Sequence, residues 1–219
     1  ATDEYVVGYT HINAKKHVPP YLGSNGRAQF RIYPEWKKDE IYFHSTTKLA
    51  PALTLKSRLW YDTFDNTLDS YDDFTYSTQK GKQGWTSIYN DYALGANANL
   101  VWATSDSNDL KVGANNKYDV HRSHNVGEPV AHISEGIYSF AVEDEARLSP
   151  QLSATASVGW FARQGYKIEE YNAKRGLAEM PNSHDGNVNA LAAIDYHPSA
   201  LHHFRFTVSR SSLFARMKD

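Results

Sequence analysis

Apolar and polar residues alternate with a period of two along most of the chain. Between Leu53 and Tyr61 the odd positions are mainly apolar, whereas Lys56 and Arg58 occupy even positions. This period is that of a β-strand whose two faces meet different surroundings, rather than the 3.6-residue period of an amphipathic helix. The pattern predicts an all-β chain, an antiparallel meander of about nine or ten long strands. The clearest segments are 4–12, 39–49, 52–62, 85–103, 109–121, 136–148, 151–162, 187–197 and 201–210.

Short and long connections between these segments alternate along the chain. The long ones are polar and cover 13–38, 63–84, 122–135 and 163–185. Residues 27–33 have strand character, but we expect them to extend a long loop rather than to form a separate strand. The short connections are 49–53, 104–109, 148–152 and 196–201, and most of them contain a proline, which suits a tight turn. This alternation is typical of outer-membrane β-barrels, which have short periplasmic turns and long extracellular loops.

A strand that crosses a bilayer has one face in hydrocarbon and the other toward the barrel lumen. We expect the charged side chains to face the lumen, because a basic residue facing lipid at the midplane costs ~2–4 kcal/mol. The residues predicted to face the lumen, or a plug domain inside it, are Lys56, Arg58, Asp91, Lys117, Glu143, Glu145 and Arg147. The residues predicted to face lipid include Val142, Ala146, Leu148, Leu152, Ala154 and Val158.

Asp144 is an exception, since the alternation points this carboxylate toward lipid. Either a β-bulge reorients its side chain, or the residue lies near a membrane interface, where a charge costs little. Aromatic residues near the strand ends are candidates for the girdles that flank the apolar band of such barrels. They are Trp60, Tyr61, Trp102, Trp160, Phe161 and Tyr196.

Composition mainly excludes other classes of protein. Of 219 residues, 41% are hydrophobic and 22% are charged, and the formal net charge of -2 gives no basic surface for nucleic acid. The absence of cysteine excludes disulfides and thiolate metal sites. No apolar run reaches the ~18 residues that a transmembrane helix needs. Bacterial single-chain barrels have an even number of strands, so an odd number predicts that residues 1–219 are part of a larger barrel domain.

Several segments resemble the TonB-dependent outer-membrane receptors, most closely the siderophore-receptor branch. They include YPEWKKDEIYFHSTTKL at 33–49, the strand and loop at 58–79, and the strand, Ser-Pro turn and strand at 138–160. Ala215 departs from the family pattern, which has proline there. The resemblance implies a barrel of about 22 strands closed by a plug domain, in the lipid of the cell outer membrane of a Gram-negative bacterium. It also implies uptake of a metal chelate such as a ferric siderophore, with the TonB complex as partner through the plug region, and neither an enzyme activity nor a cofactor.

Several polar and aromatic residues lie in or beside the predicted loops. His121 and His124 have a His-x-x-His spacing, but no helix holds them on one face, so we predict no metal site there. Lys80 and Lys82 would help to attract an anionic chelate. The candidates for ligand binding are Trp36, Tyr71, Tyr76, Trp85, His121, Arg122 and His124.

Two other classes of function are compatible with the residues alone. An outer-membrane β-barrel enzyme would need a catalytic constellation near one rim, and a soluble β-sandwich carbohydrate-binding module would use loop aromatics. The acidic run 143–145 suggests paired carboxylates for acid–base chemistry, but the alternation argues against this, because Glu143 and Glu145 share one face and Asp144 points to the other. Arg147 lies on the same face as Glu143 and Glu145, which favours salt bridges instead.

Overall fold

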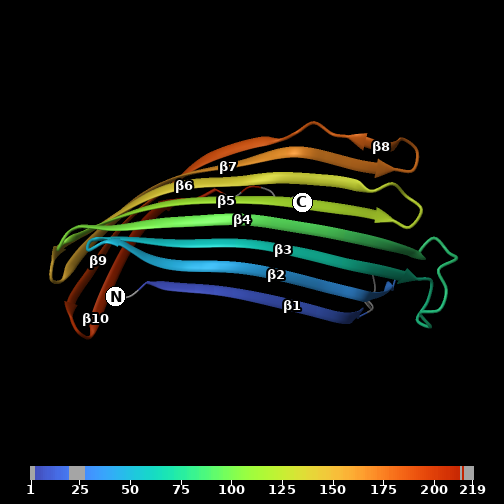
Figure 1. Cartoon of the computed structure of the whole chain (residues 1–219), viewed down its shortest axis with the longest axis horizontal. Coiled ribbons are helices and arrows are strands. Elements are labelled where there is room, and N and C mark those ends of the chain that lie inside the picture. Colours follow the sequence, from blue (N-terminus) through green and yellow to red (C-terminus); the bar gives the residue numbers. More distant parts are fainter. Residues whose placement is uncertain (1–2, 20–27, 213, 215–219) are drawn as a thin grey trace.

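The computed structural model describes residues 3–19, 28–212 and 214, which form one curved antiparallel sheet (Figure 1). Its strands are β1 (Glu4–Val18), β2 (Phe30–Ala50), β3 (Leu53–Tyr71), β4 (Trp85–Ser105), β5 (Asn108–Asn125), β6 (Ala131–Ser149), β7 (Leu152–Asn172), β8 (Gly176–Glu179), β9 (His184–Ser199) and β10 (His202–Arg210). The predicted all-β meander is confirmed. Among the described residues no helix is long and apolar enough to cross a membrane.

Consecutive strands are neighbours throughout the sheet. The order is β1-β2-β3-β4-β5-β6-β7-β9-β10, and the short strand β8 pairs only with β7. The connections 51–52, 106–107, 150–151 and 200–201 lie at one end of the strands, on the left in Figure 1, and the longer connections lie at the other end. The predicted alternation of short connections with longer ones is therefore confirmed. Among residues 3–19, 28–212 and 214 the sheet is not closed, and β1 and β10 form its two edges.

The strands extend well beyond the predicted segments. β3 continues to Tyr71 rather than ending at 62, and β5 continues to Asn125. β2 begins at Phe30, so residues 30–33 belong to the main sheet and not to a loop. The prediction of a long loop at 122–135 is wrong, because only 126–130 separate β5 from β6.

The apolar pattern ends before the strands do, which explains this difference. On β3 the odd positions change from Leu59 and Tyr61 to Thr63 and Asp65. At ~3.3 Å per residue, the apolar part from Leu53 to Tyr61 is about 27 Å long. A tilt of ~35–45° reduces its height to about 20 Å, close to the ~25 Å apolar band of membrane barrels. Beyond that band the former apolar side of β3 becomes polar and Phe64 and Leu68 lie on the other side, so the pattern that marked the strand is lost and a loop is predicted.

The register defines two faces of the sheet, because successive side chains of a strand point to opposite sides. Leu59 pairs with Phe43 and Ala96, whereas Arg58 pairs with Asn97. The side that we call the apolar face carries Val7, Phe43, Leu59, Leu94, Val112, Phe140, Val158, Ile194 and Phe206. The side that we call the charged face carries Lys56, Arg58, Asp91, Lys117, Glu143, Glu145, Arg147 and Asp195.

The two faces differ in exposure. On the apolar face, within the inner strands, Leu59 is 51% exposed and Phe140 is 50% exposed. On the charged face Asn66, Ser87 and Glu135 are each only 6% exposed. A single-layered sheet that curls shields the side chains on its inner side, so these exposures indicate that the charged face is the concave one. The described residues contain no second layer that covers the apolar face.

Two aromatic residues predicted for the girdles lie on the charged face. Trp60 pairs directly with Gly95, and a Cβ added to Gly95 would lie 2.1 Å from the Trp60 ring. Trp60 therefore packs flat across the space that the glycine leaves, with the Arg58 guanidinium 5.1 Å from its ring. Phe161 pairs with Ser139, which also puts it on the charged face. The girdle prediction is wrong for Trp60 and Phe161, because strand parity outweighs closeness to a strand end.

A row of tyrosines marks the limit of the apolar face on the side away from the short turns, which we call the upper side. The Tyr61 and Tyr92 rings lie 6.2 Å apart, and the Tyr118 and Tyr166 rings lie 5.8 Å apart. The Tyr138 hydroxyl is hydrogen-bonded to that of Tyr166. Trp102, Trp160 and Tyr196, the other predicted girdle residues, share this face. The phenol hydroxyls thus lie where apolar side chains give way to polar ones, as in an aromatic girdle.

Asp144 lies on the apolar face without a bulge. The pairing of β5 with β6 is continuous, and Asp144 is opposite Leu110. The Asn108 side-chain amide donates a hydrogen bond to its carboxylate at 2.9 Å. Asn108 is the first residue of β5, next to a short turn. Of the two explanations, the structure therefore supports a position near the interface.

Candidate functional site: the charged face

The register places every residue predicted to face the lumen on the charged face. Lys56 and Arg58 lie opposite asparagines of β4, and Lys117 lies opposite Gly95. Of the residues predicted to face lipid, Val142, Ala146, Leu152, Ala154 and Val158 lie on the other face, and Leu148 falls at a shift of the register between Arg147 and Ser149. The face itself therefore carries the side chains that would meet a solute, a plug or water, and its composition decides what it can contact.

Ion pairs link neighbouring strands near the short turns. The Lys111 ammonium lies 2.9 Å from a Glu143 carboxylate oxygen and 3.0 Å from one of Glu145. The Arg147 guanidinium lies 2.8 Å from the Asp109 carboxylate. These side chains are about 25–43% exposed, and solvated pairs of this kind stabilise a fold by less than ~1 kcal/mol each. Their main effect is to neutralise the carboxylates of this face. Salt bridges of Glu143 and Glu145 were predicted, and their partner is Lys111.

The most buried ion pair joins β6 to β7. Arg163 Nε lies 2.9 Å from Glu135 Oε2, and the two side chains are only 13% and 8% exposed. The Arg163 guanidinium also donates a hydrogen bond to the Ser183 hydroxyl at 3.2 Å. Sequence reasoning missed this pair because Glu135 and Arg163 lie in segments predicted to be loops. The local pattern gave no clear signal for it, because Glu135 has the same parity as Ile133 and Ile137.

His121 is buried on the charged face and is only 6% exposed. Its Nδ1 lies 2.8 Å from the Asp91 carboxylate, which also accepts a hydrogen bond from the Arg122 backbone N–H at 3.1 Å. Arg122 points to the opposite side, where its Nε donates to the Asn90 carbonyl at 2.8 Å. The His121 and His124 side chains fall on opposite faces because they are three positions apart on β5, rather than in a loop as predicted.

Two of the predicted ligand-binding aromatics lie on the charged face above the apolar band. The Trp36 ring packs edge-on against Phe64 at 4.7 Å, and the Lys16 ammonium lies 3.2 Å above it. The Arg31 guanidinium lies 5.2 Å from the Trp85 ring. These contacts are cation–π pairs, in which an aromatic face stabilises a cation. Both tryptophans are therefore held in place beside a positive charge.

Tyr71 and Tyr76 do not join those tryptophans. The Tyr76 backbone has a φ of 51°, and its ring packs edge-on against Tyr71 at 5.7 Å and Phe30 at 6.1 Å. Tyr71 lies on the face opposite to Trp85, two strand positions beyond Asp69. These contacts fasten the loop 72–84 against the ends of β2 and β3. The predicted ligand-binding residues are thus divided between two faces and do not form one pocket.

The loop 72–84 is organised by its own carboxylates. Asp72 accepts hydrogen bonds from the backbone N–H groups of Lys80 and Gly81 at 2.8 and 2.9 Å. Asp73 accepts a hydrogen bond from the Thr75 hydroxyl at 2.5 Å and another from the Thr75 backbone N–H at 2.8 Å. These bonds, that from the hydroxyl first, lower the pKa of Asp73 below its usual range. The backbone of Lys80 is therefore held in place within the loop. Lys80 and Lys82 are the two residues predicted to attract an anionic chelate.

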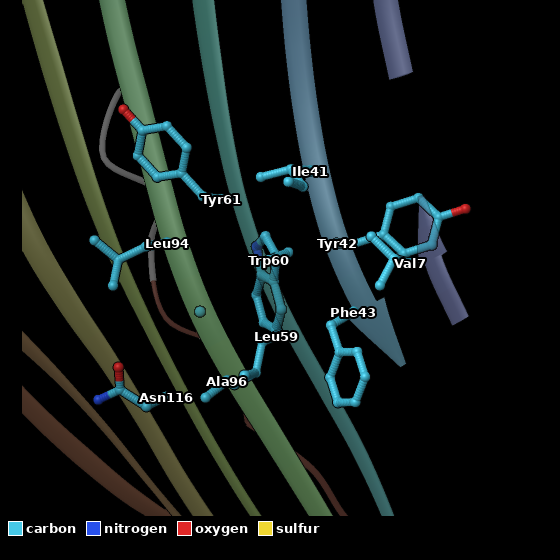
Figure 2. Close-up of a pocket in the computed structure, with 11 residues that line it drawn as sticks. Val7, Ile41, Tyr42, Phe43, Leu59, Trp60, Tyr61, Leu94, Ala96 and Asn116 are labelled. Atoms are coloured by element: carbon cyan, nitrogen blue, oxygen red, sulfur yellow. The ribbon is translucent and has the colours of Figure 1, made fainter. Parts of the chain in front are cut away.

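A hollow of about 540 Å³ lies on the other side of the sheet. Figure 2 shows the side chains of Val7, Ile41, Leu59, Tyr61 and Leu94 set around it. Its lining is nearly all apolar, and these residues belong to the apolar face. A groove of this shape and polarity suits hydrocarbon, because the polar groups in its lining are few, among them the Tyr42 and Tyr61 hydroxyls and the Asn116 amide, and no charged residue of the described chain lines it. We therefore regard the charged face as the candidate functional surface.

The chain resembles known structures in fold. It aligns with the copper transporter OprC with a TM-score of 0.71 and 11% identity, covering 97% of this chain and 36% of that chain. It aligns with the toluene transporter TbuX of Ralstonia pickettii at 11% identity, covering 95% of this chain and 66% of that one, but the TM-score of 0.45 is too low to support an argument. No protein-family model matches the chain, and no curated protein matches its sequence. The likeness to OprC shows a shared fold, over about a third of that transporter's length.

Proposed function

We propose that the chain forms part of the wall of a transport barrel in the outer membrane of a Gram-negative bacterium. The observation that carries this proposal is the division of one uncovered sheet into a charged concave face and an apolar face about as tall as a bilayer's hydrocarbon band. The alternation of short and long connections supports the same orientation, with the short turns on the periplasmic side. The fold shared with OprC also supports a transporter.

Within this proposal the barrel is of the TonB-dependent receptor kind and takes up a metal chelate such as a ferric siderophore. The resemblance of segments 33–49, 58–79 and 138–160 to that family supports this narrower class. A plug domain would contact the charged face and would connect it to the TonB complex. Trp36 and Trp85 are the best placed of the ligand candidates, because they lie on that face above the apolar band.

The alternatives fit less well. A soluble β-sandwich buries the apolar face of each sheet against a second sheet, whereas Leu59 and Ile194 of this sheet are 51% and 50% exposed. A barrel enzyme needs a nucleophile or paired acid and base close together. On the charged face Glu143 and Glu145 are instead held by Lys111.

The membrane part of the proposal is tested with the protein that carries this chain, refolded in detergent and in lipid vesicles. We expect partition into the membrane fraction and slower gel migration after heating, because a folded barrel is more compact than its unfolded chain. A monomer that stays folded in buffer without detergent would overturn the proposal.

The transport part is tested by growth of cells under iron limitation, with the full-length protein as their receptor and different ferric chelates as the iron source. We expect growth that depends on TonB and is weakened by Trp36→Ala or Trp85→Ala. Trp102→Ala, on the apolar face, is the matched control. Growth that is unaffected by deletion of either the receptor or TonB would contradict this function.

A further inference from the structure

Three potential metal ligands meet on the charged face at the β9–β10 hairpin. Within the described part of the chain, Asp195, His197 and His203 form the one group of three such residues whose ligand atoms all lie within 4.8 Å of one another. His203 Nε2 lies 2.8 Å from Asp195 Oδ1. The His197 and His203 rings are stacked in parallel, with centroids 4.0 Å apart. The strand pairing brings these residues together, since Asp195 lies opposite Arg205.

We propose that these residues bind a divalent transition-metal ion. Two imidazoles and one carboxylate are the donors that Zn²⁺, Co²⁺, Ni²⁺ and Cu²⁺ prefer, whereas Mg²⁺ and Ca²⁺ prefer oxygen alone. The stacked rings come from two different strands, so one ion bound between them and Asp195 would link β9 to β10. For metal distances of ~2.0–2.2 Å the two rings would turn about their side-chain bonds, so that one nitrogen of each points at the ion.

The site is reachable and its carboxylate is largely shielded. The Asp195 side chain is only 12% exposed, while that of His203 is 49% exposed. His197 also lines an open hollow of about 500 Å³ beside the turn 150–151. An ion can therefore approach from the side of the short turns. A buried carboxylate with imidazoles at its open side binds a cation more strongly than a solvated one, because water screens it less.

Arg205 supplies a competing cation. Its guanidinium lies 3.5 Å from Asp195 Oδ2, on the oxygen that His203 does not contact. A bound metal would share the Asp195 carboxylate with Arg205, and the two positive charges would repel each other. Removal of the Arg205 charge should therefore strengthen metal binding. A purely structural cluster predicts no such gain.

The proposal is tested by calorimetric titration of the purified protein in detergent with Zn²⁺, and by the visible absorption of added Co²⁺. We expect one ion for each chain. His197→Ala and His203→Ala should each weaken binding at least about tenfold, because even the loss of a residue behind a ligand weakens metal sites ~10–100-fold. Arg205→Gln should bind more tightly than the unaltered protein. Binding should also raise the unfolding temperature of the unaltered protein.

His202→Ala is the matched control. His202 is the neighbouring histidine, but its Nδ1 lies 3.0 Å from the Ser199 hydroxyl and its ring stacks on Phe204, outside the cluster. Its replacement should leave Zn²⁺ affinity unchanged. Each variant must retain heat-dependent gel migration, and Asp195→Asn preserves the shape of the site if an alanine variant does not fold. Equal Zn²⁺ affinity for His203→Ala, Asp195→Asn and the unaltered protein would overturn the proposal. The inference depends on the fold and not on the proposed transport function.

Discussion

The buried ion pair between Glu135 and Arg163 gives the sharpest test of how the charged face is held together. At 2.9 Å and an effective dielectric constant of ~20, the attraction between the two charges is about 6 kcal/mol before desolvation is subtracted. Removal of one partner leaves a charge that the fold has taken out of water, and such changes cost ~3–5 kcal/mol. We therefore expect Arg163→Met to lower the free energy of unfolding by about 3 kcal/mol.

The assay is equilibrium urea unfolding in lipid vesicles, followed by tryptophan fluorescence, for a double-mutant cycle. Glu135→Gln combined with Arg163→Met should cost less than the sum of the single changes, with a coupling of ~1–3 kcal/mol. Arg147→Met removes an arginine from the exposed pair with Asp109 and should cost much less than Arg163→Met, because water screens that pair. The reasoning is refuted if Arg163→Met costs no more than Arg147→Met, or if the coupling is below ~0.5 kcal/mol.

Three further changes test the faces and the loop. Gly95→Leu should destabilise the sheet by ~1–3 kcal/mol, as urea unfolding would measure, because its side chain would overlap the Trp60 ring. Val158→Arg should cost ~2–4 kcal/mol in vesicles, while Ser157→Arg on the charged face should cost far less; equal costs would contradict the assignment of faces. The pKa of Asp73 is lowered in the folded loop. Its carboxylate therefore stabilises the loop fully above pH ~3.9, and this stabilisation is lost as the pH falls through the lowered pKa. An NMR titration of the loop amides would follow the loss.

The sequence by itself determined the class of fold and the two faces. A period of two is a local property of the chain, so Leu59 and Arg58 must point to opposite sides whatever their partners are. The alternation of short and long connections likewise follows from local turn signals such as those at 51–52 and 150–151. The period of two also places Trp60 on the same face as Arg58. The prediction of Trp60 as a girdle residue is wrong because it relied on the nearby strand end instead.

Only the tertiary structure decided where the strands end and which residues meet. Above the apolar band the apolar side of a strand becomes polar, and hydrogen bonding to neighbouring strands, rather than a regular hydrophobic pattern, keeps residues such as Trp36 and His121 in the sheet. The pairs Glu135–Arg163 and Asp195–His203 depend on cross-strand register. Register is set by interactions between segments distant along the chain, so the local pattern supplied each residue's face but not its partner.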